Sequence, residues 1–209
     1  TNPFGSVPDD DDHVIIQPTS LSNVDRDCIQ NASHTWLSIT TLASSSFTAS
    51  STYDLILEDE NGSGFALEFA TVDTFTHGNG TVTIRNGGTV GDAAIQPATA
   101  TSTLGLYNLS LSNSSTSCSL YGTNKIWNNV SMASANQEIV LRGATTIGGT
   151  LSLAAGEFNT KFSSTSYDLT VGGNTSGAGT LTLNDSTYTG GGAGTHIEMA
   201  GGTITIGTS

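Results

Sequence analysis

The chain is poor in positive charge. Its 209 residues include 5 Lys and Arg against 18 Asp and Glu, and the net charge at pH 7 is −13. Such a surface repels phosphate groups, and the sequence has no basic stripe to offset that repulsion. We therefore expect no nucleic-acid partner, and the acidic charge favours solubility in a bulk medium.

Long apolar runs, helical periodicity and cysteine are also scarce. No segment is long and apolar enough to cross a membrane, so we expect no membrane insertion. Helix formers are few, and apolar residues do not recur at the 3.6-residue spacing of a helix. The two cysteines, Cys28 and Cys118, could form a single disulfide, provided that folding brings their Cβ atoms together.

What the chain does have is a short repeated motif, Gly-Thr-aliphatic-Ser/Thr-aliphatic. Its four copies begin at Gly80, Gly149, Gly179 and Gly202. The alternation of apolar and small polar residues is typical of a half-buried strand. Successive copies are separated by 69, 30 and 23 residues, and 69 is three times 23. We interpret this as a period of 23 with one insertion of seven residues.

A fixed period indicates a repeat architecture, in which each unit buries its apolar face against its neighbours. Three strands of about five residues and three short corners make about 23 residues, or one turn of a coil. We predict an all-β fold, a single-domain parallel β-helix (β-solenoid) of about nine rungs. Residues 1–12 are expected to form an N-terminal polar arm, residues 13–209 the parallel β-helix domain, and residues 13–35 its cap region.

The alternating segments give the expected strands. They cover residues 13–17, 36–41, 53–58, 65–69, 81–84, 104–111, 118–121, 126–132, 138–142, 150–153, 167–171, 181–183, 197–199 and 204–206. A longer similarity relates residues 42–57 to residues 153–171, since each contains a Phe followed by Tyr-Asp-Leu. These segments are interpreted as copies of one structural design.

Two segments carry a resemblance to a known group of proteins. They are residues 7–16, with Val-Pro followed by Asp-Asp-x-Val-x-Ile, and residues 167–174, Tyr-Asp-Leu-Thr-Val-Gly-Gly-Asn. Here the chain resembles the right-handed parallel β-helix repeats of prokaryotic cell-surface and secreted proteins and of phage tail fibres and spikes. The resemblance implies a β-helix located extracellularly, on a cell surface or on a virion. Its motifs are architectural, so it implies no activity.

We therefore expect a non-enzymatic structural or adhesive subunit of an extracellular filament, a surface appendage or a virion fibre. Unpaired strand edges at the ends of a solenoid favour the protein itself as partner, in a homo-oligomer or filament. Cell-surface glycans are a second expected partner. The alternatives are a carbohydrate-active β-helix, such as a spike depolymerase or polysaccharide lyase, and a glycan-binding module.

No catalytic residue is assigned. Asp54 and Asp168 occupy equivalent places in the two long copies, so a shared role at a turn is expected in place of a paired-carboxylate site. A lyase acting on acidic polysaccharide would need cations in a groove, and Arg142 and Lys125 could share a face for that purpose.

Candidate binding residues are aromatic or acidic. Trp127, Tyr107 and Tyr121 fall on successive segments and could form a glycan-binding face, or else fill the interior or cover a flank. The acidic run of Asp9, Asp10, Asp11 and Asp12 is a weak calcium candidate, and a solvated acidic run is the alternative. No other cofactor is expected, because the histidines are dispersed and lack zinc-site spacing.

Asparagine is abundant in sequences of the form Asn-x-Ser/Thr. Such sites can carry glycans, although a chain rich in Asn, Ser and Thr also produces them by chance. Asn side chains stacked in ladders along the corners are the structural alternative. The eight sites are Asn31, Asn61, Asn79, Asn108, Asn113, Asn129, Asn174 and Asn184.

Overall fold

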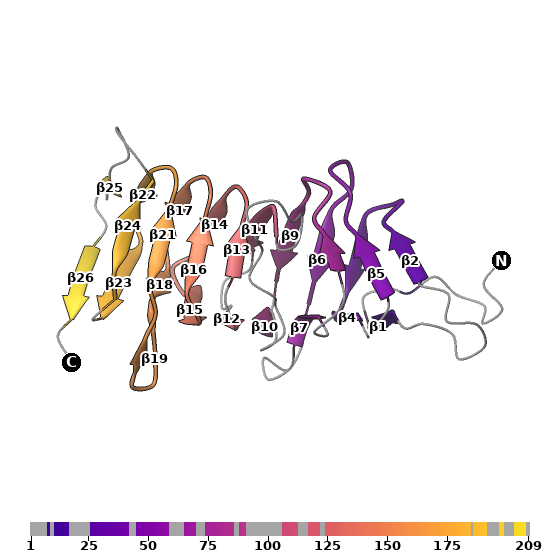
Figure 1. Ribbon diagram of the computed structural model, residues 1–209, viewed down its shortest axis with the longest axis horizontal. Helices are drawn as coiled ribbons and strands as arrows, with labels where there is room; N and C mark the ends of the chain where they lie inside the picture. The colour runs from indigo at the N-terminus through magenta and orange to yellow at the C-terminus, as the bar shows by residue number, and fades with distance from the viewer. Residues whose placement is uncertain are drawn as a thin grey trace.

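The protein is a coil of short parallel strands. The computed structural model describes residues 8, 11–16, 26–41, 45–58, 65–69, 74–85, 88–90, 106–112, 117–121, 124–184, 186–191, 197–198 and 203–207. The strands lie across the long axis of a parallel β-solenoid (Figure 1), which confirms the predicted all-β class and solenoid architecture. Within the described ranges there is no helix long and apolar enough to span a membrane.

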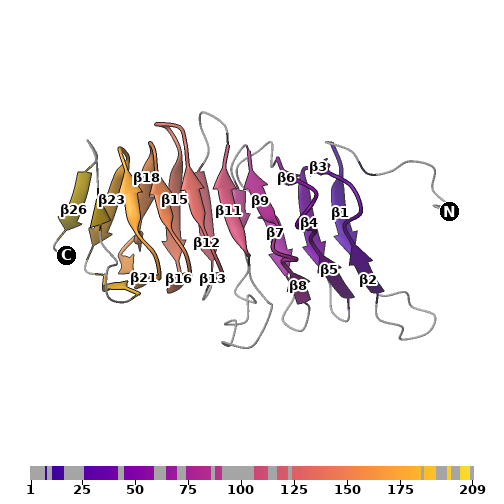
Figure 2. The same ribbon diagram turned by 90° about the horizontal axis from the view of Figure 1, so that it is seen from above.

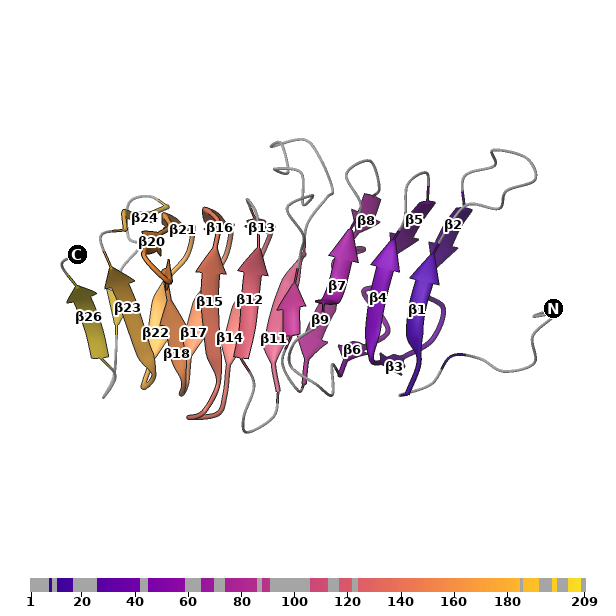
Figure 3. The same ribbon diagram turned by 90° about the horizontal axis from the view of Figure 1, so that it is seen from below.

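The solenoid has three faces, which the chain visits in the order 1, 3, 2. Face 1 is a nine-stranded sheet. In order along the coil its strands are β1 (His13–Ile16), β4 (Ser38–Thr41), β7 (Phe65–Phe69), β10 (Gly88–Val90), β12 (Ser117–Tyr121), β15 (Glu138–Arg142), β18 (Glu157–Asn159), β23 (Thr180–Asn184) and β26 (Thr203–Gly207). Figures 2 and 3 show the strands of successive turns side by side along the coil.

Face 2 is an eight-stranded sheet. Its strands are β3 (His34–Trp36), β6 (Leu55–Leu57), β9 (Thr81–Ile84), β11 (Asn108–Leu111), β14 (Val130–Met132), β17 (Leu151–Leu153), β22 (Thr175–Gly177) and β25 (Ile197–Glu198). The described strands of face 3 form two sheets. The first contains β2 (Arg26–Ile29), β5 (Ser45–Thr48) and β8 (Thr74–Thr76), and the second contains β13 (Asn124–Ile126), β16 (Thr145–Ile147), β21 (Leu169–Val171) and β24 (Tyr188–Gly190).

Within the described residues, face 3 is represented on fewer turns than face 1. An isolated bridge between Leu106 and Ile126 extends the four-stranded sheet by one position, and residues 91–105, which precede it, lie outside the described residues. Turns that have described strands on all three faces are therefore fewer than the nine rungs expected.

The core consists of aliphatic side chains stacked in register from turn to turn. On face 2, neighbouring strands align one buried residue of each above the next, in the series Leu55, Val82, Leu109, Val130 and Leu151. Burying a Val or Leu side chain stabilises a fold by about 1.5–3 kcal/mol. Because each strand has at most three inward positions, this stabilisation depends on stacking against both neighbours.

The repeated motif marks two faces of the coil. Its first two copies form β9 and β17 on face 2, and the 69 residues between them make three turns, through β11 and β14. Its last two copies form β23 and β26 on face 1, one turn of 23 residues apart. The 30-residue spacing separates a copy on face 2 from a copy on face 1. It includes the passage from one face to the next, so the inferred insertion of seven residues is wrong. The motif recurs on both faces because each needs the same alternation of inward and outward residues.

Other strand predictions fail where polar residues dominate. The expected strand at residues 36–41 is the end of β3, a corner at Leu37, and β4. Most strands of face 3 were not expected, because they are short and carry many Ser, Thr, Asn or Gly residues. A short antiparallel hairpin, β19 (Lys161–Phe162) and β20 (Thr165–Ser166), also interrupts the coil and projects from it in Figure 1.

Residues of the expected cap region form part of the first turn. Strands β1, β2 and β3 pair with β4, β5 and β6, respectively, in parallel register. The preceding segment lies against this turn, because the Trp36 indole donates a hydrogen bond to the Pro8 carbonyl at 3.1 Å and the Leu37 amide donates to the Asp12 carbonyl at 3.0 Å. Trp36 is buried and packs edge-on against Phe47.

Candidate functional site

The outward side of face 2 carries a row of hydroxyl groups. Between the inward aliphatic residues, strands β9, β11, β14 and β17 place Thr83, Ser110, Ser131 and Ser152 in register on neighbouring turns. All four are half-buried, and the Ser131 hydroxyl donates a hydrogen bond to the Ser110 hydroxyl at 3.2 Å. The parallel pairing repeats these groups at about 4.8 Å along the coil.

Asparagine side chains tie successive turns together where the chain enters face 2. The Asn108 amide oxygen accepts hydrogen bonds from the Asn128 side chain at 3.0 Å and from the Asn129 backbone at 3.1 Å. The Asn129 amide oxygen accepts from both the backbone amide and the hydroxyl of Thr150, at 2.8 and 2.9 Å. These bonds bear out the Asn ladder alternative at this corner, and they fix the orientation of the amide groups.

A shallow groove of about 370 Å³ runs over this surface. It crosses four neighbouring strands of face 2 and is open to solvent along its length. The described residues that line it are Thr81, Asn108, Leu109, Ser110, Asn129, Val130, Ser131, Thr150 and Ser152. Its lining is therefore neutral and rich in hydrogen-bond donors and acceptors.

Three rings lie together at the corner between faces 3 and 2, and they are not among the described residues that line the groove. The His77 ring lies 5.1 Å from the Tyr107 ring and 6.1 Å from the Trp127 ring, both tilted. All three side chains are half-buried. We call these three residues the aromatic corner. Tyr107 directly precedes Asn108, and Trp127 directly precedes Asn128, so the rings lie beside the Asn ladder.

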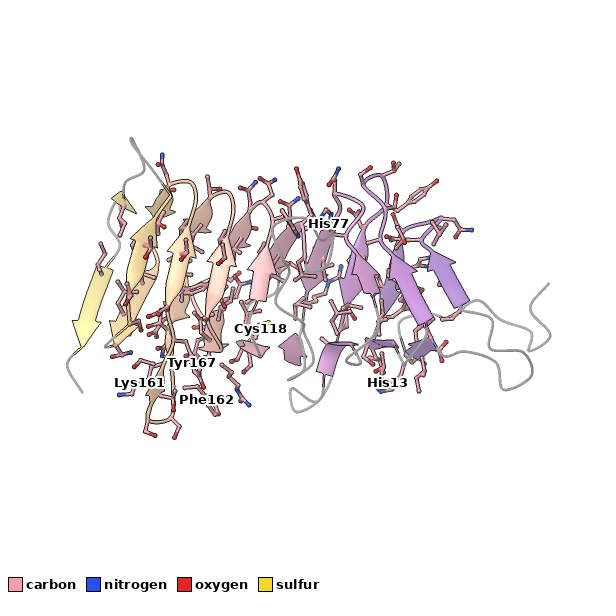
Figure 4. All side chains as sticks on the ribbon, viewed as in Figure 1. His13, His77, Cys118, Lys161, Phe162 and Tyr167 are labelled. Atoms are coloured by element: carbon pink, nitrogen blue, oxygen red, sulfur yellow. The ribbon has the colours of Figure 1, made fainter. Side chains whose placement is uncertain are left out.

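His77 is held as a neutral ring at pH 7. Partial burial lowers its pKa below the ordinary value of 6.5. The backbone amide of Asn79 donates a hydrogen bond to His77 Nδ1 at 3.0 Å, which places the remaining ring proton on Nε2. Figure 4 shows His77 on the opposite edge of the coil from Lys161 and Phe162. The sequence reasoning missed His77, and its position just before the Gly78-Asn79-Gly80 turn was the available signal.

Glycine corners follow the aromatic corner along the coil. A Cβ on Gly149 would lie 2.4 Å from the Asn129 amide oxygen, and one on Gly172 would lie 2.2 Å from the carbonyl oxygen of Gly148. Both distances are far below van der Waals contact, so these turns stack too closely to admit side chains. The corners on the turns that follow Trp127 therefore consist of backbone without side chains at these glycines.

Tyr121 does not belong to this group of rings. It ends β12 on face 1, where its register partner is Arg142. Of the three aromatic residues selected from the sequence, the structure therefore brings Tyr107 and Trp127 together and separates Tyr121. Lys125 and Arg142 are also separated, because β13 belongs to face 3 and β15 to face 1. The expectation that these two cations share a face is wrong.

Asp54 and Asp168 serve at corners, far from each other. Each directly precedes a strand, and its backbone carbonyl accepts a hydrogen bond from the previous turn, from His34 for Asp54 and from Thr145 for Asp168. The Asp168 carboxylate also accepts from the Thr187 amide at 2.9 Å. The strands that they precede, β6 and β21, lie on different faces, so the two long sequence copies are displaced from each other by one face.

A different pair of carboxylates does lie on neighbouring strands. Glu138 and Glu157 are register partners at the start of β15 and β18 on face 1, and both are half-buried. The Glu157 carboxylate accepts a hydrogen bond from the Thr182 hydroxyl at 2.6 Å. Sequence reasoning missed this pair because its 19-residue separation departs from the period of 23.

The hairpin brings a cation and an aromatic ring together on the other side of the coil. The Arg142 guanidinium carbon lies 3.7 Å from the centre of the Phe162 ring, in a cation–π arrangement. The Arg142 Nε is buried and has no hydrogen-bond partner among the described residues. Figure 4 shows Lys161, Phe162 and Tyr167 gathered at this hairpin.

The structure places the two cysteines apart and the described part of the acidic run on the surface. Cys28 is an exposed thiol on β2 and Cys118 a buried thiol on β12, on different faces, and the disulfide considered from the sequence is not formed. Asp11 and Asp12 are exposed before β1, whereas Asp9 and Asp10 lie outside the described residues. No group of three His, Cys, Asp or Glu side chains suited to a metal occurs in the described part of the chain.

The asparagine sites differ in their surroundings. Asn31 and Asn79 are exposed, and Asn174 is half-buried. Asn184 donates to the Asn159 amide oxygen on the previous turn at 3.3 Å, a second Asn ladder. Asn61 and Asn113 lie outside the described residues. Glycosylation of the eight sites stays a prediction.

The chain matches no family model, no curated protein and no solved structure in the comparisons made with each.

Proposed function

We propose that the protein is a non-enzymatic structural or adhesive module of an extracellular filament, a surface appendage or a virion fibre. The observation that carries this proposal is the stacked core from Ile16 on β1 to Leu183 on β23, along a parallel sheet that continues to β26. A coil of this kind is a long, stiff rod. Its outward residues recur at regular intervals along the rod. The sequence resemblance to surface and tail-fibre β-helices supports the extracellular, cell-surface or virion location.

Self-association is the expected mode of assembly. Among the described residues, β26 is paired only with β23, and the strand edge that faces away from β23 has no partner. Ile204 stands in register with the fully buried Leu181, yet it is 41% exposed. A second copy of the chain would continue the parallel sheet and cover this aliphatic side chain.

The test compares the wild type with Ile204→Lys, since a lysine on a strand edge opposes pairing. Thr146→Lys is the matched control, because Thr146 is exposed on β16 in the middle of the coil. We expect the wild type to form elongated particles whose mass rises with concentration, Thr146→Lys to behave likewise, and Ile204→Lys to stay smaller. Light scattering and negative-stain microscopy measure this, and a wild type that stays monomeric at high concentration overturns the filament.

The Glu138 and Glu157 pair favours a second candidate function, a polysaccharide-degrading enzyme. Register partners on adjacent parallel strands have Cα atoms about 4.8 Å apart, so side chains of equal length on them can bring two carboxylates to the separation that retaining glycosidases use, about 5 Å. The assay is the release of new reducing ends from a panel of polysaccharides, with Glu138→Gln and Glu157→Gln as inactive variants. Release by the wild type that both variants abolish would replace the structural proposal.

A further inference from the structure

We propose that the groove on face 2, together with the aromatic corner, binds a neutral oligosaccharide. This inference deepens the proposed adhesive role by naming the class of ligand and the site that takes it. Three features carry it: the rings of the aromatic corner, the fixed polar groups of the Asn ladder, and the absence of charge among the residues lining the groove.

The aromatic corner supplies an apolar surface next to polar groups. Sugar rings present C–H groups on their faces and hydroxyl groups at their edges, so they stack on aromatic rings that have hydrogen-bonding groups close by. Tyr107 and Trp127 are half-buried, which fixes the rings while leaving part of each accessible.

The polar groups of the groove are oriented before any ligand arrives. The Asn129 amide oxygen is occupied by Thr150, and its amide nitrogen is left as a donor with no partner among the described residues. The Ser131 hydroxyl donates to Ser110 and keeps its capacity to accept. Groups held in this way lose little conformational freedom on binding, which favours affinity for hydroxyl-rich ligands.

The length and charge of the groove favour a neutral oligosaccharide over a single sugar or an acidic ligand. The groove crosses β9, β11, β14 and β17, a span of about 14 Å at the usual strand spacing, which suits an oligosaccharide better than a single sugar. The lining has no charged residue, His77 is neutral at pH 7, and the whole chain carries −13. Acidic polysaccharides and nucleic acids, which also stack on aromatic rings, are repelled.

The experiment measures binding of neutral and acidic oligosaccharide panels by glycan array and then by calorimetry. The protein is made in a host that adds no N-linked glycans, because Asn108 and Asn129 lie in the groove. We expect Trp127→Ala to weaken binding about tenfold or more and Trp127→Phe to retain most of it. Phe162→Ala is the matched control, since it removes an exposed ring from the opposite edge of the coil, and it should bind as the wild type does.

Three outcomes overturn the proposal: no binding to any neutral oligosaccharide, binding only to acidic ones, or equal binding by the wild type and Trp127→Ala. Circular dichroism and urea unfolding of each variant separate lost binding from lost folding. Repeating the measurement on the Ile204→Lys background separates ligand binding from self-association. A wild type that binds the oligosaccharide and never assembles would refute the filament and leave the glycan site standing.

Discussion

Faces 1 and 2 of the solenoid have the same inward design and different outward chemistry. Both stack aliphatic residues in register, such as Leu109 on face 2 and Leu141 on face 1. Outward, face 2 carries Ser and Thr hydroxyls, whereas face 1 carries the carboxylates of Glu138 and Glu157. The inward residues therefore specify a coil without specifying a function, and the outward residues distinguish the faces.

The largest expected effect tests whether the two inward faces are equivalent. Leu109→Ala and Leu141→Ala each remove a fully buried side chain between two neighbouring turns. Each should lower the free energy of unfolding by about 2–5 kcal/mol, since the removed methyl groups leave a cavity that stacked turns cannot close. Urea unfolding followed by circular dichroism measures the change.

The control for this pair is Ser110→Ala, which changes an outward residue between Leu109 and Leu111 on the same strand. It should alter the free energy of unfolding by no more than about 0.5 kcal/mol. A Leu141→Ala variant that costs as little as Ser110→Ala would show that face 1 is not part of the cooperative core.

The inward design could be predicted from the sequence because it is periodic. The 69-residue spacing from Gly80 to Gly149 corresponds to three turns on face 2, and the 23-residue spacing from Gly179 to Gly202 to one turn on face 1. Which face a copy occupies could not be predicted, since the same alternation suits either. Strands of face 3 such as β24, Tyr-Thr-Gly, lack the aliphatic pair that would have identified them.

The candidate site was only partly predictable. Tyr107 and Trp127 were selected as aromatic residues on successive segments, and they do lie on neighbouring turns. Tyr121 was included because strand order in the sequence says nothing about which of three faces a residue joins. His77 was omitted because a lone histidine carries no signal until the coil places it beside two other rings.

A smaller effect is expected at the hairpin on the face 1 side. Phe162→Ala removes the ring over which the Arg142 guanidinium lies. Because Phe162 is 39% exposed, the loss should be about 0.5–1 kcal/mol in the free energy of unfolding, the range of an exposed cation–π pair. A double-mutant cycle with Arg142→Ala isolates the pair, and a coupling energy of zero would show that the ring and the cation act independently.

The smallest effect concerns pH and belongs to the aromatic corner beside face 2. Burial lowers the pKa of His77 in the folded protein below 6.5, so the unfolded chain binds a proton more readily than the folded chain does. The stability linked to this histidine is therefore complete above pH 6.5 and is lost as the pH falls below 6.5 towards the folded pKa.

His77→Gln tests this linkage by removing the titrating group from the corner. The free energy of unfolding should fall less between about pH 7.5 and pH 5.5 in the variant than in the wild type. His34, whose pKa is also lowered by burial where it stacks on Trp36, should contribute in the same direction, and His34→Gln measures its share. An unchanged pH dependence in His77→Gln would mean that the ring is solvated in the folded state, and the aromatic corner would then be a looser surface than its distances of 5.1 and 6.1 Å indicate.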